Sequence, residues 1–364
     1  MLITWRGVVA VAVREDRPGV VAVDAVDDDG QSLVALAYVD LVGRPEPGQR
    51  LLVNTTALDL GLGTGGVAFV VAPADGSVPH GDEGPRGHLV KARYTPLQAT
   101  VAGTDEQGSG QHAVLAEADD LDGVVVVVAD LHSALTPILA GLYADAPDAR
   151  VVYVLSDGAA LPMAFSSTVA GLREAAWLHG TVSTGQAFGG DLETVSLHSG
   201  LLTARLVQGA DVVVVTQGPG NLGTDTRWGF SGVAAGEAVN AASVLGGRPV
   251  AALRISGADP RRRHRGVSHH SLTAYGRVAL RAADVVVPDL RAVDAGLAHE
   301  VDEAVLGLAE RHRLVHVDVT GLEQAVLAAP VPTRSMGRAF ADDPAYFLAQ
   351  AAAGRHAAAL VSGH

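Results

Sequence analysis

The chain has 364 residues, of which 48% are hydrophobic and 18% are charged, and it contains no cysteine. This composition excludes an intrinsically disordered chain, and the missing cysteine excludes disulfides, thiolate nucleophiles and cysteine-based zinc sites. With 26 basic and 40 acidic residues, the net charge of −14 argues against nucleic acid as a partner, because nucleic-acid binding depends on Lys and Arg at the phosphates.

No targeting segment or membrane-spanning run is visible in the sequence. The N-terminal region reaches Glu15 before any long apolar stretch forms. The longest β-branched run, Val124–Val128, is far shorter than the roughly 20 residues that span a bilayer. We therefore expect a cytoplasmic protein with no membrane partner.

Residues 1–75 predict a small β-barrel or sandwich. Short Val-rich runs alternate with turn signals such as Arg17-Pro18-Gly19, and none of the intervals has the period of a helix. Residues 76–111 are expected to be a linker and connecting segment, because Pro73–Gly87 is rich in Pro, Gly and acidic residues. The expected strands are Val8–Val13, Val20–Val26, Leu33–Tyr38, Arg50–Asn54 and Val67–Ala72.

Residues 112–329 predict a doubly wound, mostly parallel α/β domain of Rossmann-like type. Short uninterrupted apolar runs, typical of strands covered on both faces, alternate with segments of helical length such as Leu131–Tyr143 and Ser166–Trp177. The expected strands are Val124–Ala129, Val151–Leu155, Gly180–Thr184, Asp211–Thr216, Pro249–Ile255, Asp284–Val287 and Val315–Val317.

Residues 330–364 predict a helical tail. Asp342-Asp343-Pro344 is expected to be an N-cap with proline in the first helical turn, and an Ala-rich helix follows it. We expect this helix to pack on the body of the protein or on another subunit, so a homo-oligomer is a candidate assembly.

Polar segments follow five of the expected strands, at the edge where ligands bind in open α/β sheets. Asp130 and His132 follow the first strand, Asp157 the second, and His264 the fifth, so these four are candidates for acid–base catalysis. A Ser-His-Asp hydrolase has little support, because the segment around Ser231 lacks the second glycine of a nucleophile elbow. The convergence predicts an enzyme, a hydrolase or transferase acting on a small anionic or phosphorylated metabolite. A non-catalytic ligand-binding or regulatory module is the alternative.

A glycine loop and an arginine-rich segment form the candidate anion site. The loop after the fourth strand spells G-x-G-x-x-G, and glycines let the backbone approach a phosphate. A dinucleotide site and a plain tight turn remain alternatives, because several residues separate the loop from the expected helix Gly229–Leu245. A solvated surface loop is the other interpretation of the arginines. The candidate anion-binding residues are Gly218, Gly220, Gly223, Thr224, Arg254 and Arg265.

Histidines and carboxylates beside the same edge are candidate ligands for a divalent metal cofactor. Without cysteine, a zinc or manganese site must use imidazole nitrogens and carboxylate oxygens. The alternative is that these residues are ordinary polar loop residues held by hydrogen bonds. The candidates are Asp130, His132, His198, His269 and His270.

Six motifs resemble the bacterial family known as domain of unknown function 3866. The matching segments are Gly87–Gln98 (GHLVKARYTPLQ), Asp130–Ser133 (DLHS), Ser156–Pro162 (SDGAALP), Ala187–Glu193 (AFGGDLE), Gly218–Gly232 and His264–Thr273 (HRGVSHHSLT). The resemblance extends from the N-terminus to Leu290, and it implies a bacterial protein with a barrel-like N-terminal part and an α/β part. It brings no activity, substrate or cofactor with it, so the site assignment rests on the residues.

Overall fold

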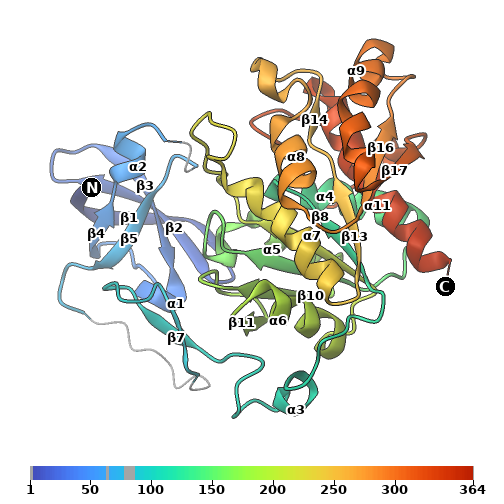
Figure 1. The fold of residues 1–364 in the computed structure, drawn as a ribbon. Coiled ribbons are helices and arrows are strands. Elements are labelled where there is room, and N and C mark those ends of the chain that lie inside the picture. Colours follow the sequence, from blue (N-terminus) through green and yellow to red (C-terminus); the bar gives the residue numbers. More distant parts are fainter. Residues whose placement is uncertain (1–2, 63–64, 78–86, 364) are drawn as a thin grey trace. The chain divides into compact units, whose positions relative to one another are not determined.

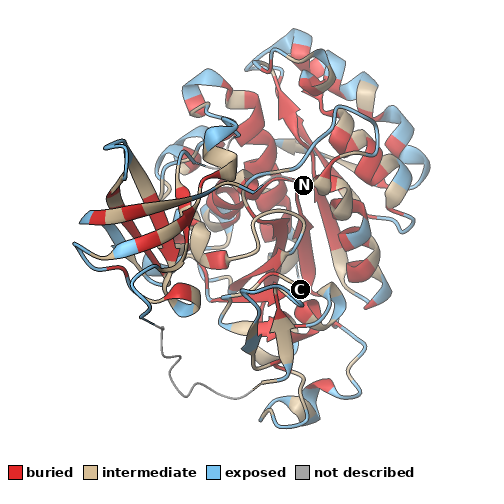
Figure 2. Cartoon of the chain, turned by 90° about the vertical axis from the view of Figure 1, so that its left-hand side faces the viewer, coloured by how far each residue is buried: buried red, intermediate tan, exposed pale blue. Residues whose placement is uncertain are grey.

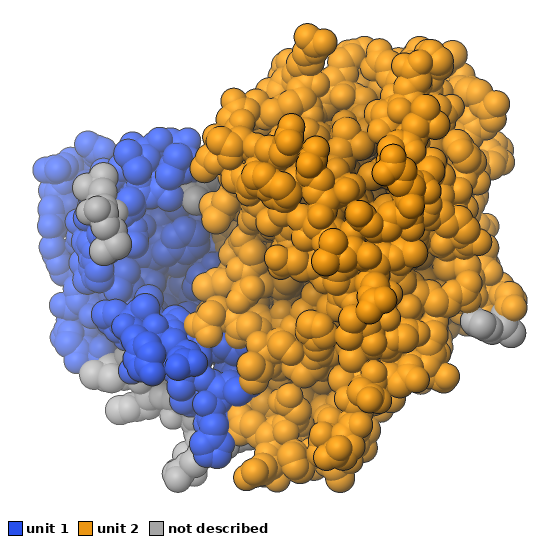
Figure 3. Space-filling view, viewed as in Figure 1, with its two compact units in different colours: residues 1–101 blue, residues 102–364 orange. Residues whose placement is uncertain are grey.

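The computed structural model describes residues 3–62, 65–77 and 87–363 of the chain. It divides into two compact units, Met1–Val101 and Ala102–His364, which are coloured separately in Figure 3. Most of the expected linker, Pro73–Gly87, lies outside the described residues. Of the helices in the described ranges, none is long and apolar enough to cross a membrane.

The first unit contains a closed barrel of five strands in the order β1-β2-β3-β5-β4 (Figure 1). Val8 of β1 pairs with Asp27 of β2 and also with Leu51 of β4, so the sheet closes on itself. Two register shifts in β1 bend the strand and allow this closure. All five predicted strands are confirmed, and the barrel is the correct alternative. The strands are β1 (Trp5–Arg17), β2 (Val20–Asp27), β3 (Ser32–Tyr38), β4 (Arg50–Asn54) and β5 (Ala68–Pro73).

Four shorter elements accompany the barrel in the first unit. Two helices of four residues each lie between strands of the barrel, α1 (Val39–Val42) and α2 (Thr56–Asp59). The strands β6 (Leu89–Lys91) and β7 (Ala99–Val101) form a separate antiparallel pair. The core of the barrel consists of small aliphatic side chains, as the Val- and Ala-rich sequence leads one to expect.

The second unit is built on a parallel sheet of eight strands in the order β11-β10-β9-β12-β8-β13-β16-β17. The seven predicted strands are present, and the doubly wound α/β fold is confirmed. The eighth strand, β11, was not predicted; its three residues extend the sheet by pairing with β10. The strands are β8 (Val125–Val128), β9 (Val151–Ser156), β10 (Gly180–Thr184), β11 (Leu192–Thr194), β12 (Val212–Gln217), β13 (Arg248–Ala252), β16 (Asp284–Asp289) and β17 (Arg313–Asp318).

Helices flank this sheet, whose strands are almost entirely buried apart from the edge strand β17 (Figure 2). The expected helix Gly229–Leu245 begins later, at Ala234, because Phe230 pairs with Gly223 and a 3-10 turn follows. The helices are α3 (His112–Leu115), α4 (Leu135–Asp145), α5 (Ser167–Glu174), α6 (Leu197–Leu202), α7 (Ala234–Val244), α8 (His269–Thr273), α9 (Ala295–Val305), α10 (Leu322–Leu327) and α11 (Pro344–Ser362). Between β13 and α8 lies a small antiparallel pair, β14 (Ile255–Ser256) and β15 (Gly266–Val267).

The C-terminal helix α11 packs on the body of its own chain. It lies against α4 and over β8, β13 and β16, and nearly all of its residues up to Ala358 are buried. Gln350 anchors it to the sheet by donating a hydrogen bond to the carbonyl oxygen of Leu253. Of the two expected packing partners, the structure therefore shows the body of the protein.

The strand order reverses around β8 and β12, near the middle of the sheet. The chain leaves β8 for β9 on one side, returns to place β12 between β9 and β8, and then crosses to β13 on the other side. In open α/β sheets, the carboxyl ends of the strands at such a reversal form the crevice that binds ligands. We therefore expect a ligand site among the loops after β8, β9, β12 and β13.

Candidate functional site

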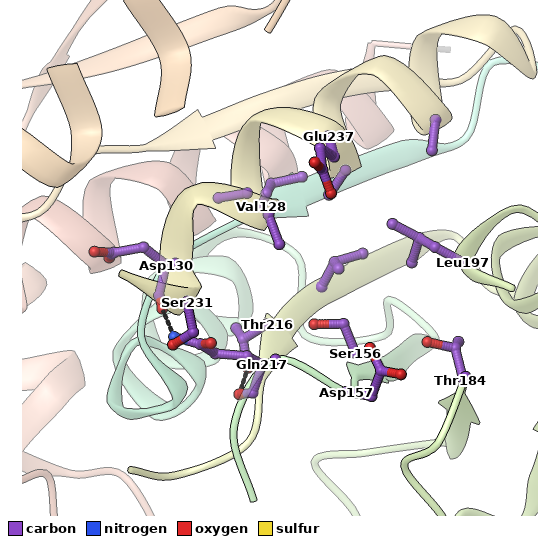
Figure 4. Close-up of a pocket in the computed structure, with 18 of the residues that line it drawn as sticks. Val128, Asp130, Ser156, Asp157, Thr184, Leu197, Thr216, Gln217, Ser231 and Glu237 are labelled. Atoms are coloured by element: carbon purple, nitrogen blue, oxygen red, sulfur yellow. Dashed lines mark hydrogen bonds between the residues drawn. The ribbon is translucent and has the colours of Figure 1, made fainter. Parts of the chain in front are cut away.

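A pocket of about 320 Å³ lies at the carboxyl ends of β8, β9, β10 and β12, between α6 and α7 (Figure 4). The strand residues Val128 and Val215 line it from the side of the sheet. Small side chains of α7, among them Ala235 and Ala238, leave room between the helix and the sheet. A cavity of this volume suits a small metabolite.

The polar groups of the pocket are hydroxyls and carboxylates. Asp157 and Glu237 supply carboxyl groups, whereas Asp130 turns its carboxylate towards His270 (Figure 4), and no described lining residue is Lys or Arg. The hydroxyl-bearing lining residues are Ser156, Thr184, Ser196, Thr216 and Ser231. This lining favours a ligand with hydroxyl or amino groups over one whose negative charge is buried in the pocket.

Asp157 is held in place by the turn that follows β10. Its Oδ2 accepts a hydrogen bond of 2.9 Å from the backbone N–H of Gln186. Gly185 has a φ of 62°, and a Cβ at this position would clash with the carboxylate of Asp157. The glycine therefore permits the close approach that presents the exposed Asp157 carboxylate at the pocket.

Asp130 connects the pocket to a group of histidines. Asp130 lines the pocket, while its Oδ2 lies 3.4 Å from Nδ1 of His270. This oxygen is buried and has no hydrogen-bond partner among the described residues. Gln217, at the end of β12, donates to the backbone oxygen of Asp130 and holds the loop after β8 beside β12.

The histidine cluster consists of His264, His269 and His270. Their ring centroids lie 4.5 to 5.1 Å apart, and the ring of Phe230 stacks on His270 at 3.8 Å. Burial, together with the nearby charge of Arg254, lowers the pKa of His264 to about 3. His264 is therefore neutral at physiological pH.

The two candidate anion-binding arginines lie beside this cluster and contact partners within the chain. Arg254 is buried, 3.3 Å from Nδ1 of His270 and 3.8 Å from Oδ2 of Asp259. The exposed Arg265 donates to the carbonyl oxygen of Gly257. Burial alone would raise the pKa of Asp259, but hydrogen bonds from Arg261 outweigh it and hold that pKa well below its usual range. The anion-binding role of these arginines stays a prediction.

The glycine loop after β12 does not lead directly into a helix. A Cβ on Gly218 would overlap the carbonyl oxygen of Ala160, so this glycine allows the loops after β9 and β12 to touch. Gly220 has a φ of 84°, and Gly223 pairs with Phe230. The N–H of Thr224 donates to the carbonyl oxygen of Gly229, a partner within the same exposed loop. Anion binding by this loop likewise stays a prediction.

The structure separates His132 and His198 from the histidine cluster. His132 is buried in the 3-10 turn after β8, with Nδ1 3.1 Å from the Tyr153 hydroxyl and Nε2 2.7 Å from Oγ of Ser166. Both ring nitrogens are therefore engaged, and burial lowers the pKa of His132 to about 4. The exposed His198 lies at the start of α6 and lines the pocket.

Two residues of the C-terminal segment contact these loops and were not predicted as part of the site. Asp343 accepts hydrogen bonds from the hydroxyl of Ser256 and the N–H of Gly257, and Arg338 donates to Asp343 and to Asp259. Asp343 occupies the N-cap position of α11 without a capping hydrogen bond from its side chain. The expected N-cap position and the proline that follows it are confirmed, and the carboxylate of Asp343 holds the loop after β13 instead of capping the helix.

The comparisons with known proteins agree with the motifs. The family model described as a protein of unknown function (DUF3866) matches residues 34–354. No curated protein and no solved structure matches the chain. The match extends from β3 into α11, well past Leu290, where the motif resemblance was expected to end. Because the match covers most of its length, the chain belongs to the DUF3866 family of proteins of unknown function.

Proposed function

We propose that the second unit is an enzyme, a hydrolase or a transferase, that acts on a small hydroxyl-bearing metabolite in the pocket between α6 and α7. The observation that carries this proposal is the lining of the pocket. Five residues with hydroxyl side chains, together with the carboxyl groups of Asp157 and Glu237, line one cavity of about 320 Å³ at the reversal of the strand order.

Asp157 is the candidate general acid or base. Its carboxylate is exposed at the pocket and is oriented by the N–H of Gln186. Glu237 of α7 also lines the pocket and supplies a second carboxyl group. Carboxyl groups held beside a substrate can move protons to or from its hydroxyl groups, which is the acid–base chemistry that group transfer requires.

An anionic group of the metabolite, if present, would lie away from these carboxylates. The arginine-rich segment 254–265 follows β13, beside the histidine cluster and Asp130, and the glycine loop follows β12. A phosphorylated metabolite would then place its hydroxyl-bearing part in the pocket and its phosphate towards those two segments.

Matched ligand pairs test the binding step. Thermal unfolding of the full chain should be followed with ribose and ribose 5-phosphate, and with adenosine and its 5′-monophosphate. We expect at least one member of a pair to stabilise the protein, by about 2.7 kcal/mol at 100 times its dissociation constant. Stabilisation by a phosphorylated member alone would support the additional anion site, and no stabilisation by any of the four would contradict the proposal.

The variant Asp157→Asn tests the catalytic step. With the stabilising compound as substrate, we expect the variant to bind it but to turn it over about 10²–10⁴-fold more slowly, followed by NMR. Asp119→Asn, at an exposed carboxylate that does not line the pocket, is the matched control and should keep full turnover. Binding without any turnover by the unaltered protein would instead favour a non-catalytic binding module.

A further inference from the structure

The histidine cluster brings three imidazole rings to one point. One ring nitrogen from each of His264, His269 and His270 lies within 4.8 Å of the others. Among the described residues, this is the only set of three His, Asp or Glu side chains with such convergent ligand atoms. The three residues come from the short 3-10 turn before β15 and from α8, so one loop of the sheet edge supplies them all.

The second nitrogen of two of these rings already has a partner. Nδ1 of His264 lies 2.7 Å from the hydroxyl of Ser268, and Nδ1 of His270 lies 3.4 Å from Oδ2 of Asp130. Histidines that bind metals commonly donate the other ring N–H to a carboxylate or another oxygen, which fixes the tautomer. With a proton on Nδ1, the ring of His264 turns a lone pair on Nε2 to the ligand. Nδ1 of His270 also lies 3.3 Å from Nη1 of Arg254, which can only donate, so a cation bound at Nε2 of His270 requires its proton to move to Nδ1, beside Asp130.

Two polar atoms at the cluster are buried without a hydrogen bond. They are Nε2 of His269 and Oδ2 of Asp130, which contacts Nδ1 of His270 at 3.4 Å without forming one. A buried polar atom that has lost its water and gained no partner destabilises the fold. Ring stacking with Phe230 explains how the histidines pack, but it leaves the nitrogen of His269 unsatisfied. A bound cation would satisfy that nitrogen, and it would strengthen the interaction of His270 with Asp130.

We propose that the histidine cluster binds one Zn²⁺ ion through His264, His269 and His270, with Asp130 as a positioning residue for His270. Three imidazoles and no thiolate form a ligand set typical of catalytic zinc sites, which keep a fourth position for water or substrate. At a Zn–N distance of about 2.0–2.1 Å, tetrahedral geometry sets the nitrogens about 3.4 Å apart. Small rotations of the rings would bring them to this spacing.

This site would place an electrophile beside the pocket of the proposed enzyme, because Asp130 both lines the pocket and contacts His270. A zinc ion there would polarise a bound oxygen or lower the pKa of a bound water. The inference rests on the geometry of the cluster and not on the proposed reaction, so metal binding is tested without any metabolite.

Zinc binding should be measured on the full-length chain without a polyhistidine tag, after removal of metal with a chelator. We expect one Zn²⁺ per chain by competition with a chromophoric chelator, and the visible absorption of a tetrahedral ion when Co²⁺ is bound instead. His269→Ala should weaken zinc binding by more than the roughly 100-fold that outer-shell changes reach. His299→Ala, at an exposed histidine of α9, should leave it unchanged.

A pair of carboxylate variants tests the positioning role. Asp130→Asn should weaken zinc binding roughly 10–100-fold, the range for outer-shell ligand partners, whereas Asp157→Asn should not affect it. Circular dichroism of each metal-free variant checks that it folds, and His269→Gln replaces His269→Ala if the latter does not. Absence of stoichiometric binding, or equal affinity in the parent and the His269 variant, would overturn the metal site while leaving the proposed function open.

Discussion

Replacing Gly354 by alanine should destabilise the second unit by about 3 kcal/mol, because α4 and α11 meet at their backbones. A Cβ on Gly354 would overlap the carbonyl oxygen of Ile138 and lie 2.8 Å from the N of Leu142. The overlapping atoms are backbone, so no side chain can rotate away. Alanine normally stabilises a helix interior by about 1 kcal/mol relative to glycine, and the clash outweighs this gain.

Urea unfolding followed by circular dichroism measures this loss. Gly307→Ala is the matched control, since a Cβ there meets no atom within 4 Å, and its stability should change by less than about 1 kcal/mol. Gly141→Ala should reproduce the loss from the other side of the contact, because its Cβ would overlap the carbonyl oxygen of Ala351. If Gly354→Ala were as stable as Gly307→Ala, α11 would not pack on α4 as closely as described.

The strands of both units could be predicted from the sequence because they leave a local signal. Val-rich runs of four to eight residues between turn residues identify strands whatever they pair with. The strand β11 has the sequence Leu-Glu-Thr and no such signal; it exists because Val182 to Thr184 of β10 offer an unpaired edge. The packing partner of α11 could not be predicted either, because the Ala-rich sequence carries no local signal for what the helix contacts. The structure shows that this partner is α4, through the close contact at Gly141 and Gly354.

The candidate site was predictable where topology alone brings residues together. Asp130 and Asp157 lie at the carboxyl ends of strands in one parallel sheet, so their convergence at the pocket follows from the fold. The role of Asp343 was not predictable, because its partner Ser256 lies 87 positions away and no pattern connects them. The sequence shows the positive charge of the arginines after β13. It does not show that buried carboxylates such as Asp259 pair with them, which only the folded structure reveals.

Asp130 and His132 lie only two positions apart in the chain, yet Asp130 lines the pocket and His132 lies in the core. Asp130 and His132 follow the same strand and were predicted together as site residues. The 3-10 turn that begins at His132 carries its ring into the core, where Ser166 and Tyr153 contact its two nitrogens. The Tyr153 hydroxyl is in turn 2.9 Å from the hydroxyl of Thr216. The result is a buried chain of hydrogen bonds around a neutral imidazole.

Acidification should therefore destabilise the protein through His132. In the unfolded chain the imidazole has its ordinary pKa of 6.5. In the folded protein, burial lowers the pKa of His132 to about 4. Between these values the unfolded state binds more protons, so the free energy of unfolding falls as the pH falls through this window. At about 1.36 kcal/mol per pKa unit, the loss approaches about 3 kcal/mol at pH 4.

The variant His132→Gln isolates this contribution from that of the other histidines, which titrate alike in both proteins. Urea unfolding between pH 7 and pH 4, at intervals of half a unit, should show a shallower fall for the variant, by up to about 1.4 kcal/mol per pH unit. His299→Gln, at an exposed position, should keep the slope of the parent. An equal slope in the parent and in His132→Gln would mean that His132 is protonated in the folded protein at the same pH as in the unfolded chain. A shallower slope would mean that the ring stays neutral and enclosed, which suits a structural histidine and leaves metal binding to His264, His269 and His270.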